Sequence, residues 1–467
     1  MNHILVFDVG KTHVKLHLLD EELKTVNSRM MKNIIIDGEL YPHCDIDGIW
    51  LWLLSGISEF AAAFHISAIS ITTHGATAAL IDREKSGSAL VLPVLDYEYA
   101  GVEGLNEAYK KVRPDFSGTF SPDLPFGLNL GRQLFWQKEN FQAEFSQVTD
   151  ILMYPQYWAW RLSGKRCSEV TSLGCHTDLW CPDKRAYSSL VEEVIGASLF
   201  PSVVPAWTNL GPVTKDLQSK TGVSENCQVF AGVHDSNASF LRYKKYFNEI
   251  PFTVISTGTW AITMASGVST ENLKPDCDML ANVDVTGQPT VCARFMGGRE
   301  FDTLCKLTKA GPDDKVNGAT LQKLIENEIM ALPDFSGGSG PFPQARGGIS
   351  GAVSELEGTA LASIYCALML DHQLSMVGAV GNIYIEGAFA QNVWLCAILA
   401  QLRIDQAVFA SDDTTGTVQG CAQLVSWGDS ASSCFSMEKV KKCKPAKLYN
   451  LEKYKADWLN RIGNNGW

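Results

Sequence analysis

The chain has 467 residues, which at roughly 100–200 residues per domain predicts two to four domains with large cores. Lys and Arg number 39 and Asp and Glu number 51, so the net charge of −12 argues against nucleic-acid binding as the main role. Hydrophobic residues make up 46% and charged residues 19%, which is typical of a folded globular protein and excludes a disordered one.

The cysteines favour a reducing compartment. They number 13, are scattered and are odd in number, which predicts free thiols in a cytosol and not a disulfide scaffold. The tightest group is Cys167, Cys175, His176 and Cys181. Buried, inert thiols are the favoured interpretation of this group, and a zinc site is the minor alternative.

We expect neither a leader peptide nor a membrane span. The first residues run directly into an apolar stretch, without a basic region or a cleavage site. The most apolar stretch, residues 49–64, is interrupted by serines, a glycine and a glutamate, and its apolar spacing predicts a helix that faces a core. The sequence therefore indicates a cytoplasmic protein without a membrane partner.

Two hairpins of the same design occur half a chain apart. Residues 3–7 form an apolar strand, a glycine turn follows at 8–12, and residues 13–19 alternate as a second strand. The same order returns as a strand at 252–255, a turn at 256–259 and a strand at 260–264. This repetition predicts two related domains.

Further units of strand, glycine turn and helix predict an α/β architecture. Residues 228–231 lead into Gly232 and Asp235, and residues 382–385 lead into Gly387 and Asn392. The helix after Asn392 places Trp394, Leu395, Ile398, Leu399 and Leu402 on one apolar face. The glycine-rich segment 336–348 is expected to be a loop, and the tail after residue 430 a peripheral helix or extension.

The two glycine turns could bind phosphate. Backbone N–H groups in such turns suit phosphate oxygens. The residues concerned are Gly10, Lys11, Thr12 and the nearby Lys15 in the first turn, and Gly258 and Thr259 in the second. Taken alone, two ordinary hairpins remain the simpler interpretation.

Asp235 and His74 are the candidates for chemistry on a hydroxyl group. Asp235 follows a strand and a glycine, where a carboxylate can accept a hydroxyl proton or hold a metal; the alternative is a helix N-cap. His74 follows the strand 68–71 and could bond a sugar hydroxyl, or be structural. The same two interpretations apply to His234.

Eight segments in order resemble motifs of the FGGY carbohydrate kinases, a family of the sugar kinase, actin and heat-shock ATPase superfamily. They are DVGKTHVK (8–15), SITTHGAT (70–77), GLNLGRQLFWQKEN (127–140), PQYWAWRLSG (155–164), GVHDSNA (232–238), STGTW (256–260), GAFAQN (387–392) and TGTVQGCA (415–422). The resemblance covers about residues 3–428. Lys11 stands where the family usually has Thr or Ser, and Ala388 and Phe389 replace two glycines.

The resemblance implies ATP and Mg²⁺ as cofactors and Asp235 as the general base. It implies a nucleotide site formed by Asp8, Gly10, Lys11, Thr12, Lys15, Gly258, Thr259, Gly387, Ala388, Gln391 and Asn392. It implies a sugar site formed by His74, Gly75, Asp96, His234 and Asp235, with Glu98 as an alternative to Asp96, and metal binding by Asp8 and Asp235.

The resemblance also implies the fold and the reaction. We expect two actin-like (ribonuclease H-like) α/β domains with an interdomain cleft that closes on sugar, at residues 1–244 and 245–440, and an extension at 441–467. The expected activity is ATP-dependent phosphorylation of a five- or six-carbon ketose or related sugar similar to L-rhamnulose, L-fuculose or xylulose. The alternatives are a non-catalytic sugar or nucleotide sensor and a polymerising actin-like ATPase. A small-molecule sugar is the expected partner, with neither nucleic acid nor membrane, and a homodimer is compatible with the family.

Overall fold

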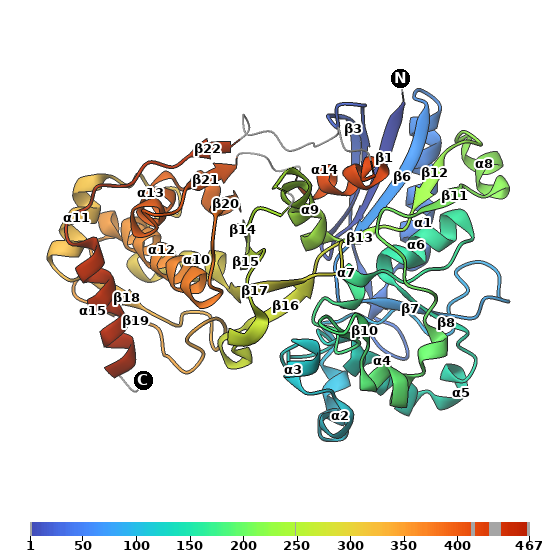
Figure 1. Cartoon of the computed structure of the whole chain (residues 1–467), viewed down its shortest axis with the longest axis horizontal. Coiled ribbons are helices and arrows are strands. Elements are labelled where there is room, and N and C mark those ends of the chain that lie inside the picture. The colour runs from blue at the N-terminus through green and yellow to red at the C-terminus, as the bar shows by residue number, and fades with distance from the viewer. Residues whose placement is uncertain (1, 248, 412–415, 429–439, 465–467) are drawn as a thin grey trace. The chain divides into compact units, whose positions relative to one another are not determined.

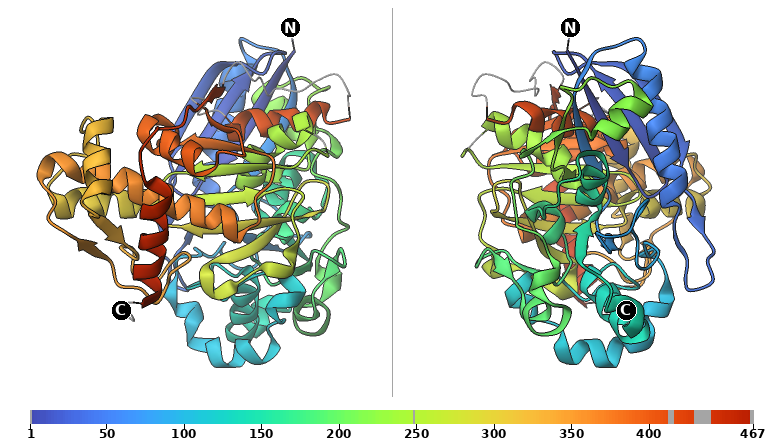
Figure 2. Two further views of the ribbon diagram at one scale, coloured as in Figure 1. Left: turned by 60° about the vertical axis from the view of Figure 1, so that its left-hand side comes forward. Right: turned by 90° about the vertical axis from the view of Figure 1, so that its right-hand side faces the viewer.

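The computed structural model describes residues 2–247, 249–411, 416–428 and 440–464 (Figures 1 and 2). The chain forms two compact units. Unit 1 comprises Met1–Tyr246, Ala281–Pro289 and Thr415–Phe435, and unit 2 comprises Phe247–Leu280, Thr290–Thr414 and Ser436–Trp467. Unit 1 therefore includes two segments that lie beyond residue 244, where the sequence placed a single boundary.

The main sheet of unit 1 has the strand order β11-β12-β6-β1-β2-β3, and β13 also pairs with β6. Its strands are β1 (His3–Val9), β2 (His13–Leu19), β3 (Thr25–Lys32), β6 (Ile66–Thr73), β11 (Asn209–Pro212), β12 (Gln228–Phe230) and β13 (Val233–His234). β1 and β2 form the expected antiparallel hairpin, and β1, β6, β12 and β13 are parallel neighbours. Because parallel strands end at one edge of a sheet, the residues that follow β1, β6 and β13 lie close together.

Helices cover both faces of this sheet. Leu5, Phe7 and Val9 point to a core that contains α1 (Ile46–Ala61) and α6 (Tyr154–Ser163). Val6 points the other way, to a second core with α9 (Asp235–Phe247) and α14 (Gly416–Gln423). The period-2 alternation of β1 therefore produces a sheet that is apolar on both faces, as an α/β fold requires.

A second group of elements in unit 1 surrounds the hairpin of β7 (Ala78–Ile81) and β8 (Asp150–Met153). It comprises β4 (Ile35–Ile36), β5 (His43–Cys44), α2 (Asn106–Val112), α3 (Phe116–Thr119), α4 (Leu130–Asn140), α5 (Gln142–Phe145), α7 (Val170–Leu173), β9 (Trp180–Cys181) and β10 (Ala186–Tyr187). α8 (Lys215–Thr221) instead packs against α1, in the core of the main sheet. Cys167, Cys175 and Cys181 are buried, which agrees with the favoured interpretation of that cluster.

Unit 2 repeats the arrangement of unit 1. Its sheet has the order β16-β17-β15-β14-β20-β21-β22, in which β14 and β15 form an antiparallel hairpin and β20 is parallel to β14. The strands are β14 (Phe252–Thr257), β15 (Ala261–Ala265), β16 (Met279–Val283), β17 (Pro289–Phe295), β20 (Asn382–Gly387), β21 (Val408–Ser411) and β22 (Val440–Lys442). The order β6-β1-β2-β3 of unit 1 thus matches β20-β14-β15-β17, and the two-hairpin prediction is confirmed. The turn of the second hairpin is Gly258–Trp260, one residue later than expected at its end.

The helices of unit 2 are α10 (Gly297–Thr308), α11 (Gly318–Glu326), α12 (Gly358–Met376), α13 (Val393–Leu402) and α15 (Leu451–Asn464), with the small hairpin β18 (Met330–Leu332) and β19 (Gly348–Ser350). Residues 336–347 form the expected loop, and its start is held by Asp334, which accepts bonds from the backbone N–H groups of Ser336 and Ser339. In the described part of the chain, every helix is too short or too polar to cross a membrane.

The C-terminal tail contains a helix, which is one of the two forms that the sequence suggested, and it packs against unit 2. β22 pairs with β21, and α15 packs beside β18 (Figure 1). Trp458 is 1% exposed and donates its indole N–H to the carbonyl oxygen of Ala331 at 2.8 Å. The buried residues Leu448, Leu451, Tyr454 and Trp458 of the described tail therefore belong to the core of unit 2; Thr415 and residues 429–439 lie outside the described residues.

Candidate active site

Asp8 is the last residue but one of β1, near the carboxyl edge of the unit 1 sheet, and is 8% exposed. Lys15, opposite it on β2, is 3.9 Å from its carboxylate. Burial raises the pKa of Asp8 to about 7, with a further contribution from the charge of Asp235, while Lys15 opposes the shift. A carboxylate in this state is stabilised by an additional cation.

Asp235 is the first residue of α9 and its side chain is 34% exposed. Its Oδ1 accepts the backbone N–H of Ser236 at 2.6 Å and lies 3.1 Å from Nε2 of His234. Within the described residues, all the bonds recorded for this carboxylate end on Oδ1, so Oδ2 remains for a ligand. The helix-start role expected as the alternative and a role toward a ligand are therefore compatible.

His234 contacts Asp235 and is almost fully buried. Nδ2 of Asn237 lies 3.3 Å from its Nδ1, and Sγ of Cys175 lies 3.4 Å from its Nε2. Burial lowers the pKa of His234, so the ring is neutral; the Asn237 amide donates to Nδ1, which leaves the Nε2 proton for Asp235. His234 therefore orients the Asp235 carboxylate. A side chain at Gly75 would come within 3.0 Å of Nε2, which explains the glycine there.

His74 follows β6 and presents one ring nitrogen without a partner. Its Nδ1 donates to the carbonyl oxygen of Gly75 at 2.9 Å, whereas its buried Nε2 has no hydrogen-bond partner among the described residues. Burial lowers the pKa of His74, so the ring is neutral and Nε2 is an acceptor. Tyr97 and Tyr154 flank the ring at centroid distances of 5.5 and 5.2 Å. A buried acceptor of this kind fits a ligand hydroxyl.

Lys11 does not present a free ammonium group in the first glycine turn. Its Nζ is bonded to the Asp96 carboxylate, lies 3.4 Å from Oε2 of Glu98 and sits 4.5 Å from the centre of the Tyr97 ring. Asp96 and Glu98, which the sequence analysis placed at the sugar, thus bind Lys11, which it placed at the phosphate.

In the rest of the first turn, the backbone of Gly10 is bonded within the protein, whereas two side chains are exposed. Gly10 donates its N–H to the carbonyl oxygen of His13 at 3.0 Å, and its own carbonyl oxygen accepts the Asn33 amide at 2.8 Å. Thr12 is exposed, and the Lys15 side chain is 42% exposed. Thr12 and Lys15 are therefore available to a ligand at this edge of the sheet.

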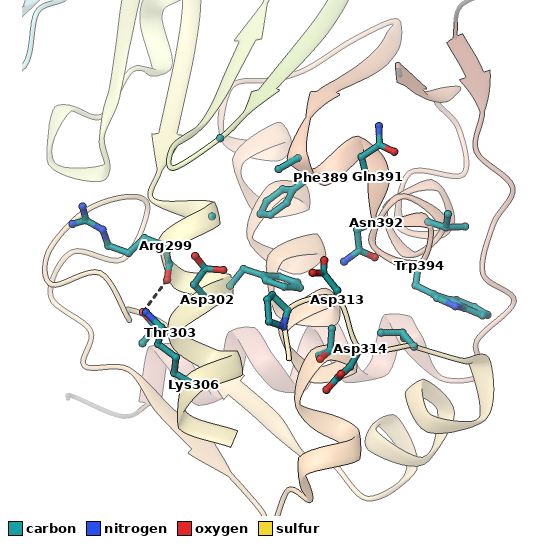
Figure 3. Close-up of a pocket in the computed structure, with 18 of the residues that line it drawn as sticks. Arg299, Asp302, Thr303, Lys306, Asp313, Asp314, Phe389, Gln391, Asn392 and Trp394 are labelled. Carbon is teal, nitrogen blue, oxygen red and sulfur yellow. Dashed lines mark hydrogen bonds between the residues drawn. The ribbon is translucent and has the colours of Figure 1, made fainter. Parts of the chain in front are cut away.

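Unit 2 contains a cavity of about 920 Å³. Gly258 and Thr259 line it, together with residues of α10, a segment before α11, and the connection from β20 to α13 (Figure 3). The lining residues drawn in Figure 3 include Arg299, Asp302, Thr303, Lys306, Asp313, Asp314, Phe389, Gln391, Asn392 and Trp394. Five sequence-predicted residues thus meet at one cavity: Gly258, Thr259, Ala388, Gln391 and Asn392.

The glycine turn and the start of α10 are in direct contact. A Cβ at Gly298 would lie 2.2 Å from the carbonyl oxygen of Gly258, so only glycine allows this approach. The cavity is consequently bordered by a glycine turn, in which Gly258 donates its N–H to the carbonyl oxygen of Trp260 at 2.8 Å, and by the N-terminus of α10, whose first backbone N–H groups have no partner within the helix. Arg299 and Lys306 add positive charge along α10.

Gly387 has a structural explanation within the sheet. Its φ is +79°, and a Cβ there would lie 1.9 Å from the carbonyl oxygen of Thr257 on β14. Glycine is therefore required by the approach of two strands, whereas the sequence assigned it to the nucleotide. Phe389 is 4% exposed and packs on Phe301 at 6.2 Å between ring centres, so most of its ring belongs to the core and only an edge reaches the cavity.

Asn392 caps α13 through Oδ1, which accepts the N–H of Leu395 at 3.0 Å, and its Nδ2 donates to Oγ of Ser363 at 2.9 Å. Both ends of this amide are thus committed within the protein. Sequence reasoning missed Arg299, Asp302 and Lys306 of α10 and the segment at Asp313 and Asp314. The adjacent glycines 297 and 298 at a helix start were the signal that could have indicated them.

The two glycine turns and the residues around Asp235 agree with comparisons to known proteins. The N-terminal domain of the FGGY family of carbohydrate kinases matches residues 3–241, and its C-terminal domain matches residues 249–433. The chain belongs to the FGGY family of carbohydrate kinases. Membership of this family implies ATP as the phosphoryl donor, which agrees with a cavity bordered by N–H groups.

A solved carbohydrate kinase from Novosphingobium aromaticivorans is 32% identical, covers 99% of both chains and has a TM-score of 0.91. A xylulose kinase from Lactobacillus acidophilus, at 15% identity and a TM-score of 0.78 over 99% of this chain and 96% of its own, shares the fold. An L-fuculokinase from Salmonella typhi is 24% identical over 56% of each chain, and a rhamnulokinase from Oceanobacillus iheyensis is 22% identical over 58% of this chain and 57% of its own. The chain therefore matches about half the length of these curated relatives. The FGGY fold also accounts for the expected actin-like α/β architecture.

Proposed function

We propose that this FGGY protein transfers the γ-phosphoryl group of ATP to a hydroxyl of a five- or six-carbon ketose or related sugar. The arrangement of Asp235 carries the proposal: its Oδ1 is fixed by Ser236 and His234, and Oδ2 is left for the acceptor. The acceptor hydroxyl gives its proton to Asp235 while its oxygen forms a bond to the γ-phosphorus. The bond from that phosphorus to the bridging oxygen breaks, and ADP leaves.

His74 supports a polyhydroxy acceptor. Its unpartnered Nε2 can accept a hydrogen bond from one hydroxyl group of the sugar. Two groups with different functions then meet the acceptor: Asp235 at the reacting hydroxyl and His74 at a second one. The relatives named L-fuculokinase, rhamnulokinase and probable L-xylulose kinase support a ketose-like acceptor.

The donor set fits Mg²⁺. Asp8 and Asp235 are near enough for the charge of one to raise the pKa of the other, and hard carboxylate oxygens are the ligands that Mg²⁺ prefers. Asp8 and Asp235 would hold the ion, which would neutralise phosphate charge when bound. Lys15 already supplies part of this compensation at Asp8.

The cavity of unit 2 is the proposed nucleotide site. N–H groups at Thr259 and the start of α10 suit phosphate oxygens, whereas the N–H of Gly258 donates to the carbonyl oxygen of Trp260 at 2.8 Å; Trp394 offers an aromatic wall. We assign the protein to the cytoplasm because this reaction requires ATP. A non-catalytic sensor on the same fold is the alternative, and it would bind both ligands without turnover.

A coupled ADP-release assay tests the proposal with a panel of ketoses and polyols, in the wild type and in Asp235→Asn. The variant keeps the shape of the side chain but cannot take the proton, so turnover should fall about 10²- to 10⁴-fold while sugar binding persists. Asp216→Asn, at an exposed pair with Lys220, is the matched control and should retain full turnover. Nearly full turnover in Asp235→Asn would remove the general-base role, and binding without turnover in the wild type would favour the sensor.

A further inference from the structure

Lys11 stands where the family usually has Thr or Ser, and its side chain is bound within the protein. Lys11 lies in the first glycine turn, but its ammonium group is held by the carboxylates of Asp96 and Glu98. The side chain of Lys11 is 21% exposed and that of Asp96 is 10% exposed, whereas that of Glu98 is 62% exposed. A half-buried lysine that is bound by two carboxylates is not free to act as a phosphate ligand.

Lys11 and His74 contact the same tyrosine ring. The Tyr97 ring connects the two: Nζ of Lys11 is 4.5 Å from its centre, and the imidazole of His74 meets it edge-on at 5.5 Å. The buried Nε2 of this imidazole has no hydrogen-bond partner among the described residues. Lys11, Asp96 and Glu98 therefore belong to the same ligand-facing region as His74.

The segment that carries the two carboxylates is fixed. The N–H of Asp96 donates to the carbonyl oxygen of Pro42 at 3.0 Å, and the N–H of Tyr99 donates to the carbonyl oxygen of Asp96 at 2.9 Å. Asp96 also accepts the N–H of Glu98 at 3.2 Å. Lys11 thus joins the first glycine turn to a segment that is already anchored, and the position of the charges is set by the fold.

From this geometry, and resting on the proposed function, we propose that Lys11, Asp96 and Glu98 form a charge filter that selects uncharged polyhydroxy acceptors and rejects sugar acids. One positive charge meets two negative ones, so a carboxylate on the acceptor would face a net negative group. The same carboxylates accept bonds from sugar hydroxyls, and the remaining N–H of the ammonium group can donate to one. Lys11 then acts on acceptor specificity and not on phosphate.

The test compares neutral ketoses and alditols with the matching aldonates in the wild type, in Lys11→Met and in the double variant Asp96→Asn/Glu98→Gln. The double variant removes both negative charges and frees the ammonium group. Its ratio of kcat/KM for aldonate over ketose should rise at least about 10-fold over the wild type. Lys11→Met should raise the KM for the neutral acceptor about 10-fold or more and leave the KM for ATP unchanged.

Lys220→Met is the matched control, because it removes a lysine–aspartate pair from the exposed surface of α8 in the same unit. It should change neither the ratio of kcat/KM for aldonate over ketose nor the KM for the neutral acceptor. A rise in the KM for ATP in Lys11→Met, with the acceptor KM unchanged, would overturn the proposal and return Lys11 to the phosphate. Wild-type turnover of aldonates as fast as that of ketoses would also overturn it.

A binding measurement separates this proposal from the proposed function. Thermal unfolding is followed with each sugar and without ATP. If the panel is bound but not phosphorylated, the kinase assignment fails, yet a neutral sugar that raises the Tm of the wild type and not of Lys11→Met still supports the filter. Equal shifts in both proteins, or no shift with either class of sugar, would overturn it.

Discussion

The imidazole of His74 shows how a single residue acquires a function from its surroundings. Its Nδ1 is occupied by the carbonyl oxygen of Gly75, so the tautomer is set and Nε2 carries the lone pair. Burial lowers the pKa of the ring, so this lone pair persists at neutral pH. From the sequence, a structural histidine was as good an interpretation; the unpartnered nitrogen now favours a ligand.

Removing that acceptor should affect the sugar and not the nucleotide. In His74→Ala, a sugar hydroxyl loses its partner in a buried site, so kcat/KM should fall about 10- to 100-fold, or about 1–3 kcal/mol. Steady-state kinetics with the sugar and with its deoxy analogues measure the effect. The loss should be smaller for the analogue that lacks the bonded hydroxyl, whereas an equal loss for every analogue would indicate a purely structural role.

The positions of some single residues could be predicted from the sequence, and the contacts of others could not. The placement of Asp8 and Asp235 at the carboxyl edge of the sheet was predictable, because Asp8 lies near the end of β1 and Asp235 directly follows β13. The partner of Lys11 was not predictable, because Asp96 and Glu98 are brought to it by tertiary structure and not by spacing. Gly387 was assigned to the nucleotide by resemblance, whereas its positive φ and its contact with Thr257 are properties of strand packing.

At the scale of elements, the connection from β20 to α13 contributes both core and cavity. It consists of the 3-10 helix η7 (Ala388–Gln391) and the capping residue Asn392. Phe389 points inward and is 4% exposed, while Trp394 is half-buried at the cavity. The sequence placed Trp394 on the apolar face of the helix, because periodicity does not distinguish a core-facing residue from one that faces a cavity.

This difference predicts opposite phenotypes for the two aromatic residues. Phe389→Ala removes a packed core ring and should cost about 3–5 kcal/mol of the free energy of unfolding, with little change in the KM for ATP. Trp394→Ala should cost less stability but raise the KM for ATP. Urea denaturation and steady-state kinetics measure the two effects. A larger rise in the KM for ATP in Phe389→Ala than in Trp394→Ala would mean that Phe389 is a wall of the nucleotide site.

At the scale of the molecule, the repeated hairpin was the most informative feature of the sequence. Strand order and register confirm the repetition, because β6-β1-β2-β3 and β20-β14-β15-β17 are arranged alike. The set of chain segments that forms each unit could not be predicted in the same way. α14 belongs to unit 1 although it lies beyond residue 411. No local sequence pattern predicts that a helix packs against a sheet whose strands lie several hundred residues earlier in the chain.

The return of α14 predicts that residues 2–246 do not fold well alone. α14 packs on β1 and β6, where Ser70 donates its hydroxyl to the carbonyl oxygen of Cys421 at 2.8 Å. A Cβ at Gly420 would lie 1.8 Å from the carbonyl oxygen of Ala238, so α14 fits closely against α9. Without α14, the apolar residues on that face of the sheet, Val6 among them, lose their cover.

A fragment of residues 2–246 should therefore bind a hydrophobic dye and unfold without a sharp transition. The same fragment with residues 416–428 attached through a flexible linker should bind less dye and unfold cooperatively, because the helix can reoccupy its place. Both fragments lack residues 281–289, so this omission is matched between them. Thermal unfolding followed by circular dichroism, with dye fluorescence in parallel, makes the comparison. Equal cooperativity in the two fragments would show that α14 is dispensable for the core of unit 1.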